Sequence, residues 1–172
     1  MQKHINNIVL VGFMGTGKTT VGKLLANKLN WSYVDTDILI EQKIGLVISK
    51  IFEQYGESYF RDRESEVIQE VMQKTQQIVA TGGGIVLRDQ NIAVMKSNGI
   101  IICLTATPEV IYERTKSNNY RPLLKVAKPQ QKIKELLEYR APFYAKADIT
   151  IDASNLAPIE IVNRILSKAN ID

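Results

Sequence analysis

The segment from Gly12 to Thr19 follows the pattern G-x-x-x-x-G-K-[ST]. Its glycines let backbone N–H groups point at phosphate oxygens, and a helix that begins here adds its positive end. Lys18 is placed to reach the β- and γ-phosphates, and the Thr19 hydroxyl is placed to ligate Mg²⁺. The segment lies between a buried apolar run, 8–11, and a helical pattern, 20–29, which is the context that such a loop requires. It predicts an ATP site with Mg²⁺ that includes Gly12, Met14, Gly15, Thr16, Gly17, Lys18, Thr19 and Thr20.

The same glycines also resemble a variant dinucleotide fingerprint. Gly12, Gly15 and Gly17 have a related spacing, and Asp35 and Asp37 follow about 20 residues on, where a ribose-binding acid would stand. The step from Gly17 to Thr19 favours the triphosphate, because a dinucleotide loop has no need for a lysine followed by a hydroxyl.

Two carboxylates end the second expected strand, beside the phosphate loop. Asp35 and Asp37 are separated by Thr36. One carboxylate can hold the water shell of the metal, and the other can orient or deprotonate an attacking hydroxyl. The alternative is a helix cap, a position that aspartate favours. Capping explains one of the two residues and stays open for it.

The elements that carry these residues alternate between strands and helices. Strands are expected at 8–11, 32–37, 77–81, 99–105 and 148–152, and helices at 20–29, 38–74 (broken near Gly45 and Gly56), 89–97, from 108, 130–146 and 158–168. The polar, proline-containing stretch 118–129 is expected to be a mobile loop. This alternation predicts a parallel sheet covered by helices on both faces, with ligands at the carboxyl ends of the strands.

Composition narrows the class of protein. The chain has 172 residues, 45% of them hydrophobic, and a formal net charge of +4, which suits one soluble domain. The basic residues are dispersed and accompany no nucleic-acid motif, so a pocket for phosphates and a carboxylate explains them better. One cysteine, Cys103, and one histidine, His4, argue against a disulfide framework or a histidine-based centre. The first apolar run is too short for a leader or a membrane helix, which predicts a cytoplasmic protein.

Five further segments occur in order along the chain: Asp35–Asp37, Phe60–Arg61, Thr81–Gly84, Asn119–Leu124 and Arg140–Tyr144. Together with the phosphate loop, they make the chain resemble the shikimate kinases over nearly its whole length. The resemblance implies an α/β, three-layer P-loop fold of the nucleoside-monophosphate-kinase type. It implies a five-stranded parallel sheet in the order 2-3-1-4-5 within one domain, 1–172, with substrate-binding helices at 38–74 and a lid loop at about 118–128.

The resemblance also implies an activity, the transfer of the γ-phosphoryl group of ATP to the 3-hydroxyl of shikimate. It implies the following roles: Lys18, Asp37 and Arg121 in catalysis, with Arg121 closing over the phosphates from the lid; Asp37, Arg61, Gly82, Gly83, Gly84 and Arg140 in shikimate binding, the two arginines at the carboxylate; Asp35 at Mg²⁺ through water; and Arg114 at the adenine.

Some of these residues have a plainer interpretation when each is taken alone. Arg61 fits a solvated helix face among Asp62, Arg63, Glu64 and Glu66, and Arg140 is similar. The three glycines fit a simple turn. Two arginines nonetheless suit one carboxylate, because a guanidinium pairs with it through two parallel hydrogen bonds.

Two other functions stay open on sequence alone: a kinase for a related hydroxy acid, such as gluconate, and an inactive nucleotide-binding homologue. A guanine-nucleotide switch is disfavoured, because Asn27–Asn30 lacks the aspartate of N-K-x-D and lies in the first helix. The expected partners are ATP and shikimate alone, with no nucleic acid and no membrane, and we expect a monomer.

Overall fold

The computed structural model describes residues 5–117 and 122–171. His4 and the predicted lid residue Arg121 lie outside the described residues, so the predicted role of Arg121 is not placed. Within the described ranges, no helix combines the length and the apolar character needed to span a bilayer.

Five parallel strands form the centre of the fold, in the spatial order β2-β3-β1-β4-β5. Their bounds are β1 Asn7–Val11, β2 Ser32–Asp35, β3 Gln77–Ala80, β4 Ile100–Thr105 and β5 Ile149–Asp152. Val9 in the central strand is in register with Val79 on one side and Ile101 on the other. The order 2-3-1-4-5 confirms the sheet that the resemblance implied.

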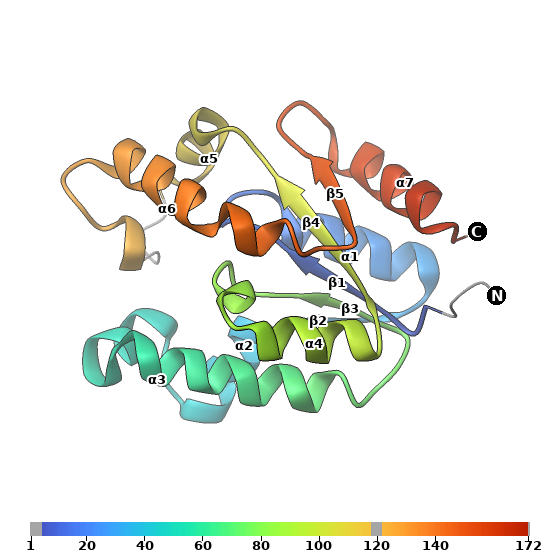
Figure 1. The fold of residues 1–172 in the computed structure, drawn as a ribbon, viewed down its shortest axis with the longest axis horizontal. Helices are drawn as coiled ribbons and strands as arrows, with labels where there is room; N and C mark the ends of the chain where they lie inside the picture. Colours follow the sequence, from blue (N-terminus) through green and yellow to red (C-terminus); the bar gives the residue numbers. More distant parts are fainter. Residues whose placement is uncertain (1–4, 118–121, 172) are drawn as a thin grey trace.

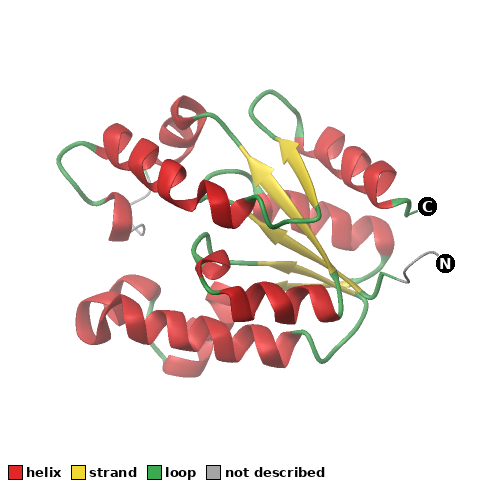
Figure 2. Cartoon of the chain, in the orientation of Figure 1, coloured by secondary structure: helices red, strands yellow, loops and turns green. Residues whose placement is uncertain are grey.

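Helices cover both faces of this sheet (Figures 1 and 2). They are α1 Lys18–Leu29, α2 Thr36–Ile44, α3 Ile48–Val71, α4 Asp89–Ser97, α5 Pro108–Thr115, α6 Pro129–Tyr144 and α7 Pro158–Ala169, with two 3₁₀ turns, η1 Ile85–Leu87 and η2 Pro122–Leu124. In Figure 1, α3 and α6 both extend past the carboxyl ends of the strands, so they can contribute side chains to that edge.

The central strand divides the core between the two faces. Ile8 and Leu10 pack in the cluster of α1 and α7, whereas Val9 and Val11 pack in the cluster that includes α3, α4 and α6. All four are fully buried. Side chains alternate across a strand, so a strand covered on both faces must be apolar throughout, as the run 8–11 indicated.

The boundaries differ from the sequence prediction chiefly at the second strand. That strand was expected to reach Asp37, but it ends at Asp35, and Asp37 lies in the first turn of α2. The Asp35 side chain accepts hydrogen bonds from the N–H groups of Asp37 and Ile38, at 2.9 and 3.1 Å, and so starts the helix. The prediction of strand at Asp37 is therefore wrong, because the capping interaction competes successfully with strand extension.

Both predicted helix breaks occur at the glycines. Gly45 ends α2 in the left-handed conformation, and Gly56 interrupts α3 with φ 82° and ψ 172°. The stretch expected to be a loop from 118 contains η2, which the sequence did not indicate.

We expect Leu25→Ala in α1 to lower the free energy of unfolding by about 2–5 kcal/mol, because Leu25 is fully buried and its truncation leaves a cavity. Denaturant titration measures the change. Leu24→Ala is the matched control, since Leu24 lies in the same helix but is 37% exposed. Equal losses in the two variants would contradict the assignment of the core face of α1.

Candidate functional site

Two adjoining cavities lie at the carboxyl edge of the sheet. One is lined by the phosphate loop and the residues after β2 and β3, and the other by α3, α6 and the glycines after β3. Three residues line both cavities: Asp37, Gly82 and Gly83. A molecule in each cavity would therefore meet its neighbour beside the Asp37 carboxylate.

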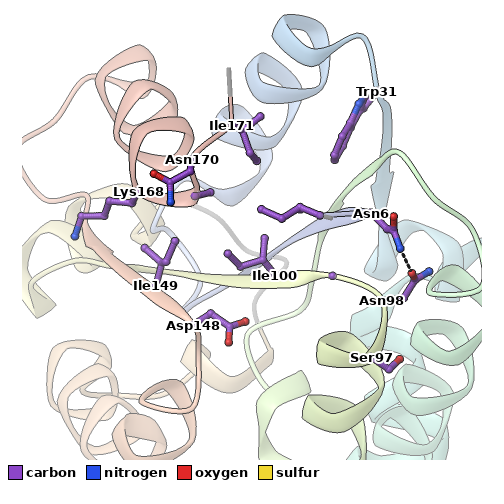
Figure 3. A pocket seen from close by; sticks show the side chains of 13 residues that line it. Asn6, Trp31, Ser97, Asn98, Ile100, Asp148, Ile149, Lys168, Asn170 and Ile171 are labelled. Carbon is purple, nitrogen blue, oxygen red and sulfur yellow. Dashed lines mark hydrogen bonds between the residues drawn. The ribbon is translucent and has the colours of Figure 1, made fainter. Parts of the chain in front are cut away.

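A larger hollow, of about 890 Å³, lies at the opposite edge of the sheet (Figure 3). Its lining includes Trp31, Asn98, Asp148 and Lys168, and none of the residues predicted to act in chemistry. The phosphate-loop cavity is only about 210 Å³ but gathers a lysine, three threonine hydroxyls and two carboxylates. The chemistry of the lining, rather than its volume, identifies the candidate site.

The phosphate loop owes its shape to glycines with positive φ. Gly12 has φ 144°, and a Cβ there would overlap the carbonyl oxygen of Leu104. Gly17 has φ 98° and precedes α1 as its N-cap. The Lys18 ammonium donates to the carbonyl oxygens of Gly12 and Phe13, at 2.7 and 2.9 Å. These contacts hold the lysine over the loop, where a bound phosphate would lie.

The other predicted nucleotide-binding residues divide into two groups. Gly15, Thr19 and Thr20 line the phosphate-loop cavity, as Gly17 and Lys18 do. Met14 instead lines the cavity on the side of α3 and α6.

Two further residues stabilise the phosphate loop. Thr16 lies in the loop itself, and Arg114 lies in α5. Thr16 is buried and donates its hydroxyl to the carbonyl of Phe13, at 2.7 Å. Arg114 donates to the carbonyl of Gly15, at 3.0 Å, which places it beside the loop as its predicted adenine contact requires.

The residues at the end of β2 fit a magnesium ion bound together with a nucleotide. Asp35 uses one carboxylate oxygen as the cap of α2, and its other oxygen lies 3.5 Å from the Tyr33 hydroxyl. Burial and the charge of Asp35 raise the pKa of Tyr33 to about 12, so that hydroxyl stays neutral. Thr19, Asp35 and Asp37 line one cavity. These oxygen donors suit Mg²⁺, which keeps most of its ligands from water and phosphate.

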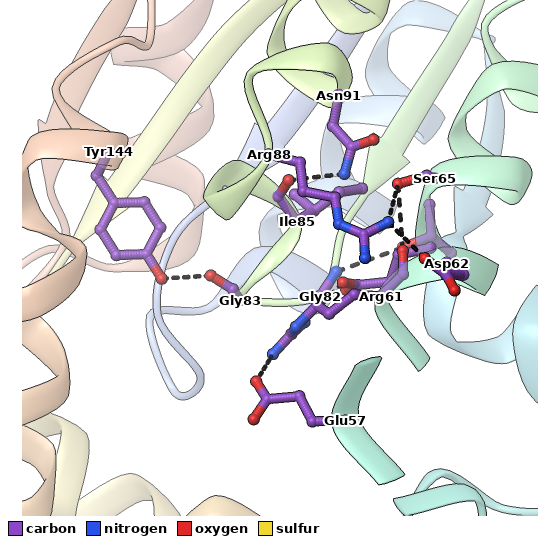
Figure 4. A network of polar contacts seen from close by, with 12 residues as sticks. Glu57, Arg61, Asp62, Ser65, Gly82, Gly83, Ile85, Arg88, Asn91 and Tyr144 are labelled. Atoms are coloured by element: carbon purple, nitrogen blue, oxygen red, sulfur yellow. Dashed lines mark hydrogen bonds and ion pairs between the residues drawn. The ribbon is translucent and has the colours of Figure 1, made fainter. Parts of the chain in front are cut away.

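Arg61 lines the second cavity and is buried, with only 8% of its surface exposed. The solvated helix face that its neighbours suggested is therefore wrong. Its Nη1 donates to Glu64, at 2.6 Å. Its Nη2 donates to Glu57, at 3.0 Å (Figure 4). Burial lowers the pKa of the guanidinium, but the two glutamates outweigh this and raise the pKa above its ordinary value.

Glu64 is fully buried between Arg61 and the glycines after β3. Burial raises the pKa of its carboxyl to about 7, although the charge of Arg61 opposes the shift. The nearby charge of Asp37 adds to the rise. Both Glu64 and Asp37 have an oxygen 2.7 Å from the position that a Cβ on Gly82 would take. Only glycine leaves room for these two carboxylates.

The glycines after β3 are in direct contact with the charged groups. A Cβ on Gly84 would overlap the guanidinium of Arg61, so that group packs directly against the Gly84 backbone. A Cβ on Gly83 would lie 3.2 Å from Nη1 of Arg140. These positions need glycine because charged side chains approach the main chain closely.

The glycine segment is also fixed by hydrogen bonds from three elements. The hydroxyl of Tyr144 in α6 donates to the carbonyl of Gly83, at 2.5 Å (Figure 4). The N–H of Gly82 donates to the hydroxyl of Thr36 in α2, at 3.3 Å. Asn91 in α4 donates to the carbonyl of Ile85, which follows the glycines. The segment is therefore a rigid wall rather than a simple turn.

Arg140 is even more deeply buried than Arg61, at 2% exposed. Its guanidinium carbon lies 5.5 Å from the centre of the Phe13 ring, in the phosphate loop. Within the described ranges, Arg140 makes no ion pair with a carboxylate. A buried cation in a cavity wall that forms no direct ion pair is a natural site for an anion.

Comparisons with known proteins agree with this geometry. The family model for shikimate kinase matches residues 14–170. The chain is similar to a shikimate kinase of Thermodesulfovibrio yellowstonii, with 51% identity over 164 residues that cover 95% of each chain. The chain belongs to the shikimate kinase family. It is therefore a kinase, and the resemblance seen in its motifs is confirmed.

Solved structures agree with the family assignment. The fold is similar to a shikimate kinase from Acinetobacter baumannii in complex with shikimate, with a TM-score of 0.92 and 40% identity over 96% of this chain and 93% of that one. A gluconokinase from Sinorhizobium meliloti is similar with a TM-score of 0.63 and 15% identity, over 96% of this chain and 91% of that one. At that identity the gluconokinase shows the shared fold alone.

Four residues of this kinase site were not predicted from the sequence: Thr36, Glu57, Glu64 and Tyr144. A signal existed for two of them. Glu57, Arg61 and Glu64 are spaced i, i+4 and i+7, which places them on one face of a helix. Thr36 and Tyr144 lie within two of the five family segments, but the sequence did not indicate what they do, because their hydrogen bonds go to the backbone of a distant segment.

We expect Gly84→Ala to raise the KM for shikimate at least tenfold, because the new methyl group displaces Arg61. The backbone at Gly84 has φ −100°, which alanine tolerates, so the effect is steric. Steady-state kinetics measure it, and the Kd of MgATP serves as the control and is expected to stay unchanged. An unchanged KM would show that Arg61 is not needed where the structure places it.

The pKa of Glu64 predicts how stability depends on pH. The pKa of Glu64 in the folded state, about 7, exceeds its ordinary value of 4.5, so the folded state holds this proton more tightly than the unfolded state and the free energy of unfolding falls as the pH rises from about 4.5 to about 7. Glu64→Gln removes this titration. We expect the melting temperature of the wild type to fall relative to that of Glu64→Gln over this range. Parallel curves, or a relative gain by the wild type, would contradict the raised pKa.

Proposed function

We propose that the protein transfers the γ-phosphoryl group of ATP to the 3-hydroxyl of shikimate, giving shikimate 3-phosphate and ADP. The observation that carries this proposal is the pair of cavities that meet at Asp37, Gly82 and Gly83. One cavity has the groups that bind phosphates, and the other has the buried arginines that bind an acid. In-line transfer requires this end-to-end arrangement of the two substrates.

At the nucleotide end, the phosphates lie along the loop 12–19 and the N-terminus of α1. Lys18 moves from its loop carbonyls to the β- and γ-phosphates and stabilises the charge on the transferred group. Thr19 would hold Mg²⁺ directly and Asp35 through water, and Arg114 would pack on the adenine. Bound Mg²⁺ neutralises charge on the phosphate oxygens.

At the acid end, Arg61 and Arg140 bind the carboxylate of shikimate. Both guanidinium groups are buried, so their hydrogen bonds to a carboxylate are little screened by water. The ring then extends from the arginines past the glycine wall towards the phosphate loop. Phe52, Phe60 and Leu123 line the apolar part of this cavity.

Asp37 stands at the junction and acts on the hydroxyl. It accepts the hydrogen bond of the attacking hydroxyl and aligns that oxygen with the γ-phosphorus. As the new P–O bond forms, the hydroxyl proton passes to the Asp37 carboxylate, and the bond from the γ-phosphorus to the ADP oxygen breaks. The backbone N–H of Gly83 or Gly84 supplies a further contact to a ring hydroxyl, since that of Gly82 is bound to Thr36.

We assign the chain one kinase domain, 1–172, with substrate-binding helices at 38–74 and a lid at about 118–128 whose Arg121 closes over the phosphates. The basic side chains Lys18, Arg61 and Arg140 serve small anions, which supports a protein without a nucleic-acid partner. We propose that it acts as a monomer in the cytoplasm, away from membranes.

The activity itself is tested by ADP release from MgATP with shikimate, gluconate or no acceptor. We expect release that depends on shikimate, at a rate of about 1–100 per second, as is usual for kinases. ADP release at the same rate with gluconate, or with no acceptor, would contradict the proposal.

The roles of Asp37 and Arg140 predict different kinetic effects. Asp37→Asn should lower kcat by about 10²-fold or more with little change in KM, because it removes the group that aligns and deprotonates the hydroxyl. Arg140→Ala should mainly raise the KM for shikimate. The controls are Asp89→Asn and Arg164→Ala, at exposed positions on α4 and α7. A near-normal kcat in Asp37→Asn would contradict the role of Asp37 at the attacking hydroxyl. An unchanged KM in Arg140→Ala would contradict the role of Arg140 at the carboxylate.

A further inference from the structure

Arg61 and Arg140, the two arginines that line the second cavity, differ in which of their nitrogens make hydrogen bonds. Both terminal nitrogens of Arg61 are bound by carboxylates of α3, Nη1 by Glu64 and Nη2 by Glu57. Its Nε is buried and makes no hydrogen bond within the described residues. The edge of the guanidinium formed by Nε and Nη2 can bind two carboxylate oxygens at once, but Glu57 uses only one of these positions.

An incoming acid therefore competes with a carboxylate of the protein for Arg61. Glu64 is not the one displaced, because it is fully buried at 2.6 Å from Nη1, and releasing it would leave an unpaired charge in the core. The guanidinium itself packs directly against the Gly84 backbone.

Glu57 has the properties of a displaceable partner. Its oxygen is 3.0 Å from Nη2, the longer of the two contacts, and its side chain is 49% exposed. Gly56 breaks α3 immediately before it, so Glu57 lies in the first turn of the helical segment that carries Arg61. A carboxylate in a first turn keeps a favourable interaction with the helix dipole after it releases Arg61. Water and this dipole thus compensate for the lost ion pair.

We propose that Glu57 occupies the position on Arg61 that the substrate carboxylate takes, and that it makes the acid end of the site selective for anions. A free carboxylate displaces Glu57 because it satisfies both Nε and Nη2, whereas Glu57 satisfies only Nη2. A neutral hydroxylated ring offers no charge to replace that of Glu57 and leaves the ion pair in place. This inference rests on the proposed function, since it requires the acid to bind between Arg61 and Arg140.

The proposal predicts that weakening the competitor tightens the binding of the acid. In Glu57→Gln, shikimate is expected to bind about two- to fivefold more tightly than in the wild type, which matches the contribution of one exposed ion pair. The methyl ester of shikimate should bind equally to both proteins.

The experiment is isothermal titration calorimetry of the full-length protein with shikimate and with its methyl ester. Glu53→Gln is the matched control, because Glu53 is an exposed glutamate four residues earlier in α3, before the break at Gly56, and pairs with Lys50 rather than Arg61. Glu57→Ala tests the same direction of change without an amide that can bind Arg61. Melting temperatures show that each variant is folded.

Tighter binding of shikimate in both Glu57 variants, with no change in Glu53→Gln or for the ester, supports the proposal. Unchanged or weaker binding in the Glu57 variants overturns it, and so does an equal gain for the ester or in the control. Failure of the wild type to bind shikimate counts against the proposed function instead. Binding by the wild type without a gain in the variants counts only against the role of Glu57.

Discussion

The proposed acid-binding end of this site depends on one buried ion pair, Arg61 with Glu64, packed against the Gly84 backbone. A buried guanidinium is costly to desolvate, so it needs a partner that stays with it when the cavity is empty. Glu64 supplies that partner at Nη1 and leaves the opposite edge of the guanidinium to Glu57 or a ligand. This ion pair in turn requires glycine at positions 82 and 84, because a side chain at Gly82 would overlap Glu64 and Asp37, and one at Gly84 would overlap Arg61.

The parallel sheet explains why these groups meet. The carboxyl ends of β1, β2 and β3 lie side by side, so the phosphate loop, the two aspartates and the three glycines start from one edge. The helices α3 and α6 then bring Arg61 and Arg140 to the same edge from distant parts of the chain. Arg140 on the Phe13 ring and Tyr144 on Gly83 connect the acid end directly to the phosphate loop and the glycine wall.

The sequence predicted the parts of this arrangement that are local. The phosphate loop, the helix breaks at Gly45 and Gly56, and the strand order, through the family resemblance, needed no coordinates. The burial of Arg61 could not be predicted from its charged neighbours, because it depends on packing against a segment more than 20 residues away. The end of β2 was misplaced because capping and strand extension compete for the same residues. Arg121 remains a sequence prediction, outside the described residues.

The central claim is that shikimate lies between the two arginines with a hydroxyl at Asp37. A crystal structure of the protein with shikimate and ADP tests it most directly. The account predicts carboxylate oxygens hydrogen-bonded to both Arg61 and Arg140, and a ring hydroxyl bonded to Asp37 and facing the phosphate loop. A carboxylate bound at the phosphate loop, or a ring without contact to Asp37, would contradict the account.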